Sequence, residues 1–235
     1  MEELYHGAAV FALYVIPAGV IMLTLRRLIW IPDELFRKIL HWILLGAYLP
    51  LLYAFNTWWL AVSFVLALIL LLYPVLALAG KIPAFSTFVN ERKEGEFKGS
   101  MVLALLTMAG SISVCWGFFG DRLLVLACVY AWGIGDAFAA LVGKKWGKHK
   151  IRFRWADRHK SVEGSAAMFV CGVVTVLTIL LLRGGLPLGF CVAVALAVAA
   201  ATTFVELCSK GGMDTITCPA AAMVVILPSV MWMGA

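Results

Sequence analysis

The feature that most constrains the fold of this chain is a series of apolar stretches, each close to the length of a membrane-crossing helix. A hydrocarbon core of about 30 Å requires about 20 apolar residues per helix. By that measure the sequence holds eight candidate spans, at residues 7–25, 39–56, 58–80, 101–119, 122–142, 165–182, 186–207 and 215–233. The sequence therefore predicts an all-α fold: a polytopic integral membrane helical bundle.

The composition supports that interpretation. Hydrophobic residues make up 63% of the 235 residues and charged residues 14%, which is outside the usual range of soluble proteins. We expect a single transmembrane domain over residues 1–235, without a separate soluble domain. The start, MEELYHG, lacks the basic region and cleavage site of a signal peptide, so the first span is expected to remain as a helix. The six cysteines occur singly and are interpreted as small core hydrophobes.

The basic residues predict the orientation of the spans. If the N-terminus lies outside, every Lys and Arg except Arg122 and Arg183 falls on the cytoplasmic side, as the positive-inside rule requires. The polar clusters fall on that side too, so we expect an active site that faces the cytoplasm. The net charge of +6 reflects this topology and would also suit a phosphate ligand. Nucleic acid is not an expected partner, because no basic face is interleaved with base-stacking aromatics.

One carboxylate, Asp136, lies inside an apolar stretch just before the most basic segment of the chain. A carboxylate in hydrocarbon is costly and usually has a function and a partner. Residues 143–160 contain eight Lys and Arg against one acid, a surplus that suits a phosphate-bearing ligand. A positive-inside anchor loop would explain the same charges without a ligand. The motif GKKWGK lacks the spacing and the preceding strand of a Walker-type phosphate loop, so we reject that assignment for it.

Two polar clusters precede this segment. In residues 32–41, PDELFRKILH, the bases Arg37 and Lys38 either reach nucleotide phosphates or extend to the membrane interface as ordinary helix-end residues. In residues 88–100, FVNERKEGEFKGS, acids and bases surround Gly95. They form either a solvated loop or a place for Mg²⁺ or a ribose hydroxyl.

Further polar residues follow. Lys160 and Glu163 stand with Ser161 and Ser165 at the entry of the sixth span, where a serine would also serve as an ordinary helix cap. Glu206 and Asp214 lie at inner helix ends, as Asp136 does, and Asp214 is also a candidate N-cap. Three acids, a basic loop and an apolar pocket open to lipid suit metal-assisted phosphoryl or nucleotidyl transfer to a lipid.

At these residues the sequence resembles the CTP-dependent lipid-alcohol kinases, the group that contains dolichol kinase, phytol kinase and the CTP-using diacylglycerol kinase. It is more distantly similar to phosphatidate cytidylyltransferase. The resemblance extends over about 185 residues and rests on ELFRKILH (34–41), NERKEGEFKGS (90–100), GDAFAALVGKKWGK (135–148), KSVEGS (160–165), and Glu206 followed by DTITCP (214–219).

The resemblance implies transfer of the γ-phosphate of CTP to a lipid alcohol of the diacylglycerol or polyprenol/dolichol type, with Mg²⁺ as cofactor. The implied partners are the lipid, the nucleotide and membrane lipids, and a homo-oligomer is possible. The implied catalytic residues are Asp136, Lys160 and Glu163, and the implied metal ligands are Asp136, Glu206 and Asp214. The implied nucleotide-binding residues are Arg37, Lys38, Glu91, Arg92, Gly95, Glu96, Lys98, Gly143, Lys144, Gly147, Lys148, Ser161 and Ser165.

The choice of nucleotide and two other functions stay open. Where relatives commonly read Asp-Asn, this chain has Asp214-Thr215, so CTP and ATP both stay open as the phosphate donor. The carboxyl-terminal cytidylyltransferase signature is absent, which ranks CDP-lipid synthesis second. A membrane transporter is the third function, although polar residues along a path through the midplane would then be expected.

Overall fold

The computed structural model describes residues 1–82, 95–151 and 160–233, and the regular secondary structure in these ranges is helical. Eight helical stretches in the described ranges are long and apolar enough to cross a membrane. The all-α fold and the number of spans are therefore confirmed, whereas the outside location of the N-terminus stays a prediction. Contacts divide the chain into two compact units, Met1–Ser113 and Val114–Ala235. The single transmembrane domain also stays a prediction.

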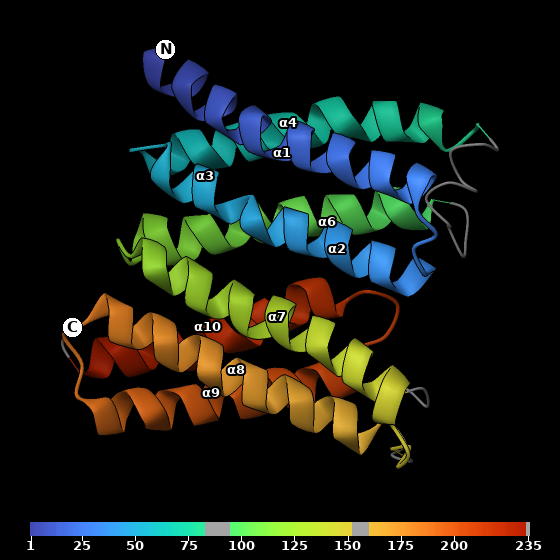
Figure 1. The fold of residues 1–235 in the computed structure, drawn as a ribbon. Helices are drawn as coiled ribbons and strands as arrows, with labels where there is room; N and C mark the ends of the chain where they lie inside the picture. Colours follow the sequence, from blue (N-terminus) through green and yellow to red (C-terminus); the bar gives the residue numbers. More distant parts are fainter. Residues whose placement is uncertain (83–94, 152–159, 234–235) are drawn as a thin grey trace. The chain divides into compact units, whose positions relative to one another are not determined.

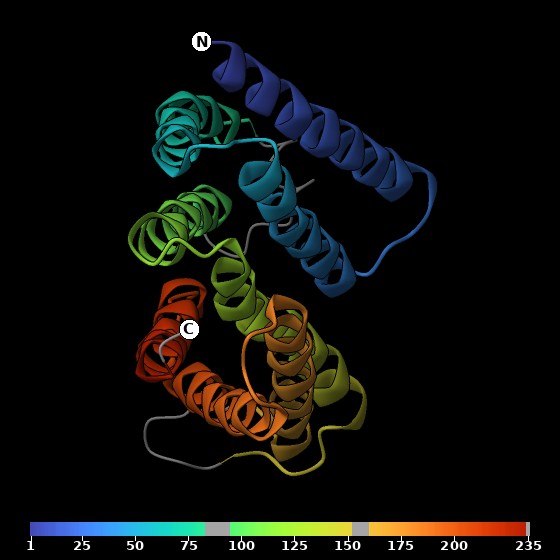
Figure 2. The same ribbon diagram turned by 90° about the vertical axis from the view of Figure 1, so that its left-hand side faces the viewer.

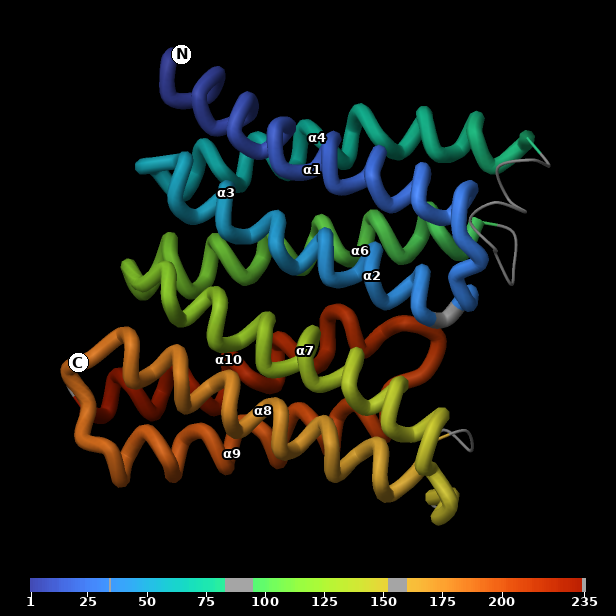
Figure 3. Tube along the Cα trace, in the orientation of Figure 1, coloured from blue at the N-terminus to red at the C-terminus, as the bar shows by residue number. Residues whose placement is uncertain are grey.

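The first unit contains five described α-helices (Figure 1). They are α1 (Glu2–Leu28), α2 (Asp33–Gly46), α3 (Tyr48–Tyr53), α4 (Trp58–Ala79) and α6 (Glu96–Ser111). Helix α1 packs against α2, α3 and α4, and α4 packs against α6. The second predicted span is divided into α2 and α3, which follow one another as two consecutive pieces of the trace (Figure 3).

A turn at Asn56 and Thr57, where the second predicted span gives way to the third, connects α3 to α4, and Glu3 of α1 holds it. The Glu3 carboxylate accepts hydrogen bonds from the backbone N–H groups of Asn56 and Thr57, both at 2.8 Å, and from the Thr57 hydroxyl at 3.0 Å. A charged acceptor strengthens each of these bonds. An acid at the start of the chain thus fixes a turn more than 50 positions later.

The second unit is built from four long helices, which follow the π-helix η1 (Ile112–Phe118). They are α7 (Arg122–Trp146), α8 (Val162–Arg183), α9 (Leu188–Cys208) and α10 (Asp214–Trp232). Helix α8 lies between α7 and α9, and α10 contacts both α7 and α9, which closes the group (Figure 2). Trp132, Met168 and Cys218 meet in a buried cluster, against which Ala139 and Val205 pack.

Small residues allow α7 and α8 to approach closely. Gly135, Ala139 and Gly143 recur every four residues on α7, and a Cβ on Gly135 would lie 2.9 Å from Met168 Cγ. On α8, a Cβ on Gly164 would lie 2.8 Å from the backbone oxygen of Ala139. Such contacts are typical of membrane helices that pack through small side chains. These small residues of α7 and α8 therefore serve helix packing.

Several helices extend beyond the approximate spans predicted from apolar residues. The fifth span was expected to end at residue 142, but α7 continues to Trp146, so Lys144 lies in its last turn. A cation there interacts favourably with the helix dipole, and its long side chain extends away from the apolar region. The fourth span was expected to begin at residue 101, but α6 begins at Glu96 and includes Lys98.

Candidate functional site

A buried ion pair joins the start of α8 to the end of α9. The Lys160 ammonium lies 2.7 Å from Glu206 Oε1 and also donates to the Glu206 backbone oxygen. The side chain of Glu206 is 8% exposed and that of Lys160 is 20% exposed. Removing one partner of such a pair leaves an uncompensated charge in a poorly solvated place. Each residue therefore depends on the other for its position.

Two further acids lie within electrostatic range of this pair. Asp136 comes from the middle of α7 and Asp214 is the first residue of α10, and their negative charges act on the Glu206 carboxylate. All three acids and Lys160 also act electrostatically on Cys218, which is buried. We call Asp136, Lys160, Glu206 and Asp214 the charged cluster. The sequence selected all four residues, and the structure brings them together from four segments of the chain.

The charged cluster has more negative than positive side chains, so it is suited to a cation. In the ranges that the structure describes, no three His, Cys, Asp or Glu side chains are grouped as ligands of a metal ion. The Glu206 carboxylate is engaged by Lys160. Mg²⁺ usually takes only one or two carboxylates and completes its shell with water and substrate phosphates. The cluster fits an ion shared with a nucleotide better than one held by three protein carboxylates.

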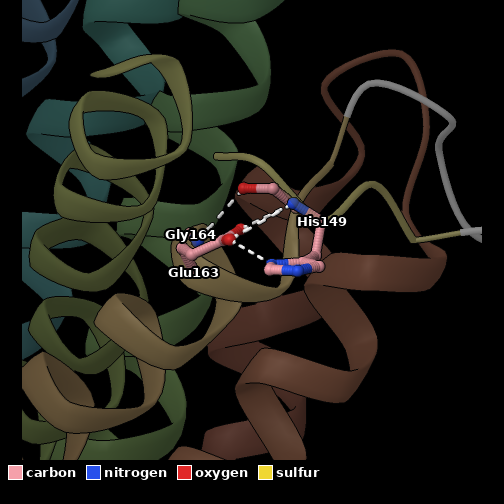
Figure 4. Close-up of polar contacts among 4 residues, drawn as sticks. His149, Glu163 and Gly164 are labelled. Atoms are coloured by element: carbon pink, nitrogen blue, oxygen red, sulfur yellow. Dashed lines mark hydrogen bonds and ion pairs between the residues drawn. The ribbon is translucent and has the colours of Figure 1, made fainter. Parts of the chain in front are cut away.

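Glu163 in the first turn of α8 is turned toward His149 (Figure 4). Its carboxylate accepts hydrogen bonds from the His149 backbone N–H, at 3.2 and 3.3 Å to its two oxygens, and contacts His149 Nδ1 at 2.7 Å. The imidazole is 79% exposed, so water screens this contact and its contribution to stability is small. The sequence predicted a catalytic role for Glu163 and did not single out His149, which stands among the bases of GKHK without a distinguishing pattern.

Ser161 is the N-cap of α8, and two predicted nucleotide-binding glycines surround it. The Ser161 hydroxyl oxygen accepts a hydrogen bond from the Gly164 N–H at 3.2 Å, which is the capping alternative that the sequence left open. A Cβ on Gly143 would lie 3.1 Å from this oxygen, and one on Gly147 would lie 2.6 Å from it. The Ser165 backbone N–H bonds to the Ser161 carbonyl as part of the helix.

The basic residues at and just after the end of α7 are more accessible than Lys160. Lys144 and Lys148 are exposed, as a site for an anionic ligand requires. Their predicted role in nucleotide binding stays a prediction.

The other predicted residues belong to the first unit. Arg37 and Lys38 lie half-buried in α2. Gly95 precedes α6 with φ +77°, a left-handed conformation that glycine adopts readily, and Glu96 follows in the first helical turn. The Lys98 ammonium lies 4.9 Å from the centre of the Tyr73 ring. The predicted residues Glu91 and Arg92 lie outside the described residues.

The fold and the charged cluster define an integral membrane protein with a candidate active site that combines residues at the ends of α8, α9 and α10 with Asp136 from the middle of α7. The chain is 29% identical over 228 residues to a phytol kinase of Synechocystis sp., which covers 92% of this chain and 90% of the relative. This relative supports, at a distant level, the resemblance to the CTP-dependent lipid-alcohol kinase family. No family model matches the chain. No solved structure matches it either.

Proposed function

We propose that this chain is an integral membrane kinase that transfers the γ-phosphate of CTP to the hydroxyl of a lipid alcohol. The observation that carries the proposal is the charged cluster of Lys160 with Asp136, Glu206 and Asp214, in a chain similar to a phytol kinase. Phosphoryl transfer needs positioning and charge neutralisation more than covalent chemistry from the protein. A lysine among carboxylates at a helix end supplies both. The lipid is of the diacylglycerol or polyprenol type, with phytol as a further candidate.

In the proposed reaction the hydroxyl oxygen of the lipid forms a bond to the γ-phosphorus, and the bond from that phosphorus to the bridging oxygen breaks. The nucleoside diphosphate leaves, and the hydroxyl proton passes to a carboxylate. We assign that role to Asp136, because a carboxylate within an apolar helix usually has a function. Lys160 neutralises charge on the phosphate oxygens.

Mg²⁺ is the proposed cofactor, held by Asp136 and Asp214 together with the phosphates. When bound, it would neutralise charge that develops between the β- and γ-phosphates. Lys144 and Lys148 would attract the nucleotide to the same helix ends, since both are exposed cations. We further propose that this site faces the cytoplasm, from the distribution of basic residues.

The proposal is tested by mixing purified protein with lipid alcohols and with CTP, ATP, GTP or UTP labelled at the γ-phosphate. Label is expected to move to phytol, diacylglycerol or a polyprenol, with CTP as the preferred donor. Asp136→Ala should abolish the transfer while the protein still purifies as a folded species, whereas Glu2→Gln, a change at an exposed acid of α1, should not. Full activity of Asp136→Ala would reject the assigned site.

The same preparation distinguishes the other functions. Pyrophosphate release from CTP in the presence of phosphatidate, without γ-label in lipid, would favour a cytidylyltransferase-like reaction. Movement of a substrate across vesicles, without any phosphate transfer, would favour a transporter.

A further inference from the structure

The backbone is held together on both sides of residues 152–159. The Ile151 N–H donates to the Lys160 carbonyl, and the Val162 N–H donates to the His149 carbonyl, each at 3.0 Å. These two bonds form the isolated antiparallel bridge between Lys150 and Ser161. The end of the α7 segment and the start of α8 are thereby joined side by side.

His149 makes most of the contacts that join these two segments. Its carbonyl accepts from Val162, its N–H donates to the Glu163 carboxylate, and its Nδ1 lies 2.7 Å from Glu163 Oε1. The Glu163 carboxylate therefore contacts both the backbone and the side chain of His149. Such multiple bonds to a charged acceptor fix orientation as well as distance.

Lys160 lies directly beside this joined segment, and its ammonium reaches Glu206 on α9. Its backbone is fixed on one side by Ile151 and on the other by the capped first turn of α8 that contains Glu163. If this backbone bridge were lost, the backbone position of Lys160 would vary, and the position of its ammonium would vary with it. A displacement of about 1 Å in a group that acts on a transferring phosphate is enough to reduce the rate about 100-fold.

We propose that His149 and Glu163 form a positioning pair that holds the Lys160 ammonium at the charged cluster. On this assignment Glu163 acts through His149 and Lys160 and is not itself a catalytic base. The inference rests on the proposed kinase function for its kinetic readout. It also makes a statement about the position of Lys160 that does not depend on the reaction.

Conservative and disruptive variants separate positioning from chemistry. Glu163→Gln keeps an acceptor oxygen for the His149 N–H groups, and His149→Asn keeps a donor close to the place of Nδ1. Both should retain most of the activity. Glu163→Ala and His149→Ala should each lower kcat/KM for the nucleotide about 10- to 100-fold, with the KM for lipid unchanged. The double alanine variant should be no worse than either single variant, because both changes break one connection.

A catalytic base predicts a different pattern. Glu163→Gln would then be as inactive as Glu163→Ala, and His149→Ala would retain nearly full activity. Either result would overturn the proposal. His6→Ala, a change at an exposed histidine of α1, is the matched control and should leave all kinetic constants unchanged.

A second measurement follows Lys160 without turnover. Purified protein is labelled briefly with acetic anhydride, and the modification of each lysine is quantified by mass spectrometry. Lys160 should react more slowly than the exposed Lys144 and Lys148, and His149→Ala should remove most of that protection while His149→Asn keeps it. Unchanged protection in His149→Ala would overturn the positioning role. Intact protection in a wild-type protein that transfers no phosphate would instead contradict only the proposed function.

Discussion

Lys160 and Glu206 are joined twice, because the lysine ammonium contacts both the carboxylate, at 2.7 Å, and the backbone carbonyl of the same glutamate. The double contact brings a cation to the end of α9, where the charges of Asp136 and Asp214 also act. Without that cation three acids would repel one another in a poorly solvated region. The pair therefore belongs to the stability of the second unit as well as to its proposed chemistry.

We expect Lys160→Met to lower the free energy of unfolding by about 3 kcal/mol, because it leaves Glu206 buried without its cation. The Lys160→Met, Glu206→Gln double variant should be more stable than Lys160→Met alone. The measurement is thermal unfolding in a fixed detergent for the wild type, both single variants and the double variant. Additive losses in the double variant would contradict the coupling.

The sequence predicts the helices well because each span carries its own signal. An apolar stretch of sufficient length must cross the membrane or be buried inside the protein, whatever segments lie beside it. It also identifies Asp136, Lys160, Glu206 and Asp214 as unusual, since charge beside apolar helix ends is costly. These inferences need only the local sequence.

The pairing of those residues is not local. Lys160 and Glu206 are 46 positions apart, and their contact depends on the register between α8 and α9, which a single sequence does not specify. His149 illustrates the same limit, because its partner Glu163 is identified only once residues 149–151 are seen to pair with residues 160–162. Gly143 illustrates a related limit. A small residue suits close helix packing and a ligand equally, and the structure places Ser161 against it.

Gly164→Ala should destabilise the protein by about 1–3 kcal/mol, because the new methyl group would lie 2.8 Å from the rigid backbone oxygen of Ala139. Gly143→Ala should cost less, since its nearest contact is the Ser161 hydroxyl at 3.1 Å. The control is Gly19→Ala in α1, where a methyl group meets nothing within 4 Å. Thermal unfolding of the three variants checks the order, and a Gly19→Ala loss as large as that of Gly164→Ala would contradict the packing argument.

Asp121 and Arg183 connect the other ends of α7 and α8. Asp121 caps α7 by accepting from the Leu123 and Leu124 N–H groups at 2.9 and 3.2 Å, and Arg183 Nε lies 2.5 Å from its second oxygen. Asp121→Ala should therefore cost about 1–2 kcal/mol of stability from the lost cap alone, whereas Asp121→Asn keeps the cap and should cost less.

These changes should not affect the KM for nucleotide, because Asp136 lies 15 residues along α7 from Asp121, about 22 Å at 1.5 Å per residue. Unfolding and steady-state kinetics on the same preparations test both statements. A raised nucleotide KM in Asp121→Asn would show that the two ends of the helix pair are coupled.

The last prediction separates the acids of the charged cluster by their response to Mg²⁺. Glu206 is engaged by Lys160, so Glu206→Gln should lower the rate without changing the Mg²⁺ concentration needed for half-maximal activity. Asp214→Asn should raise that concentration about tenfold or more, because one carboxylate is a large share of the protein ligands that Mg²⁺ uses beside phosphates. The measurement is phosphate transfer over a Mg²⁺ titration at saturating nucleotide, after removal of metal with a chelator. An equal shift in both variants would show that Glu206 is also a metal ligand and that Lys160 competes with Mg²⁺ for its carboxylate.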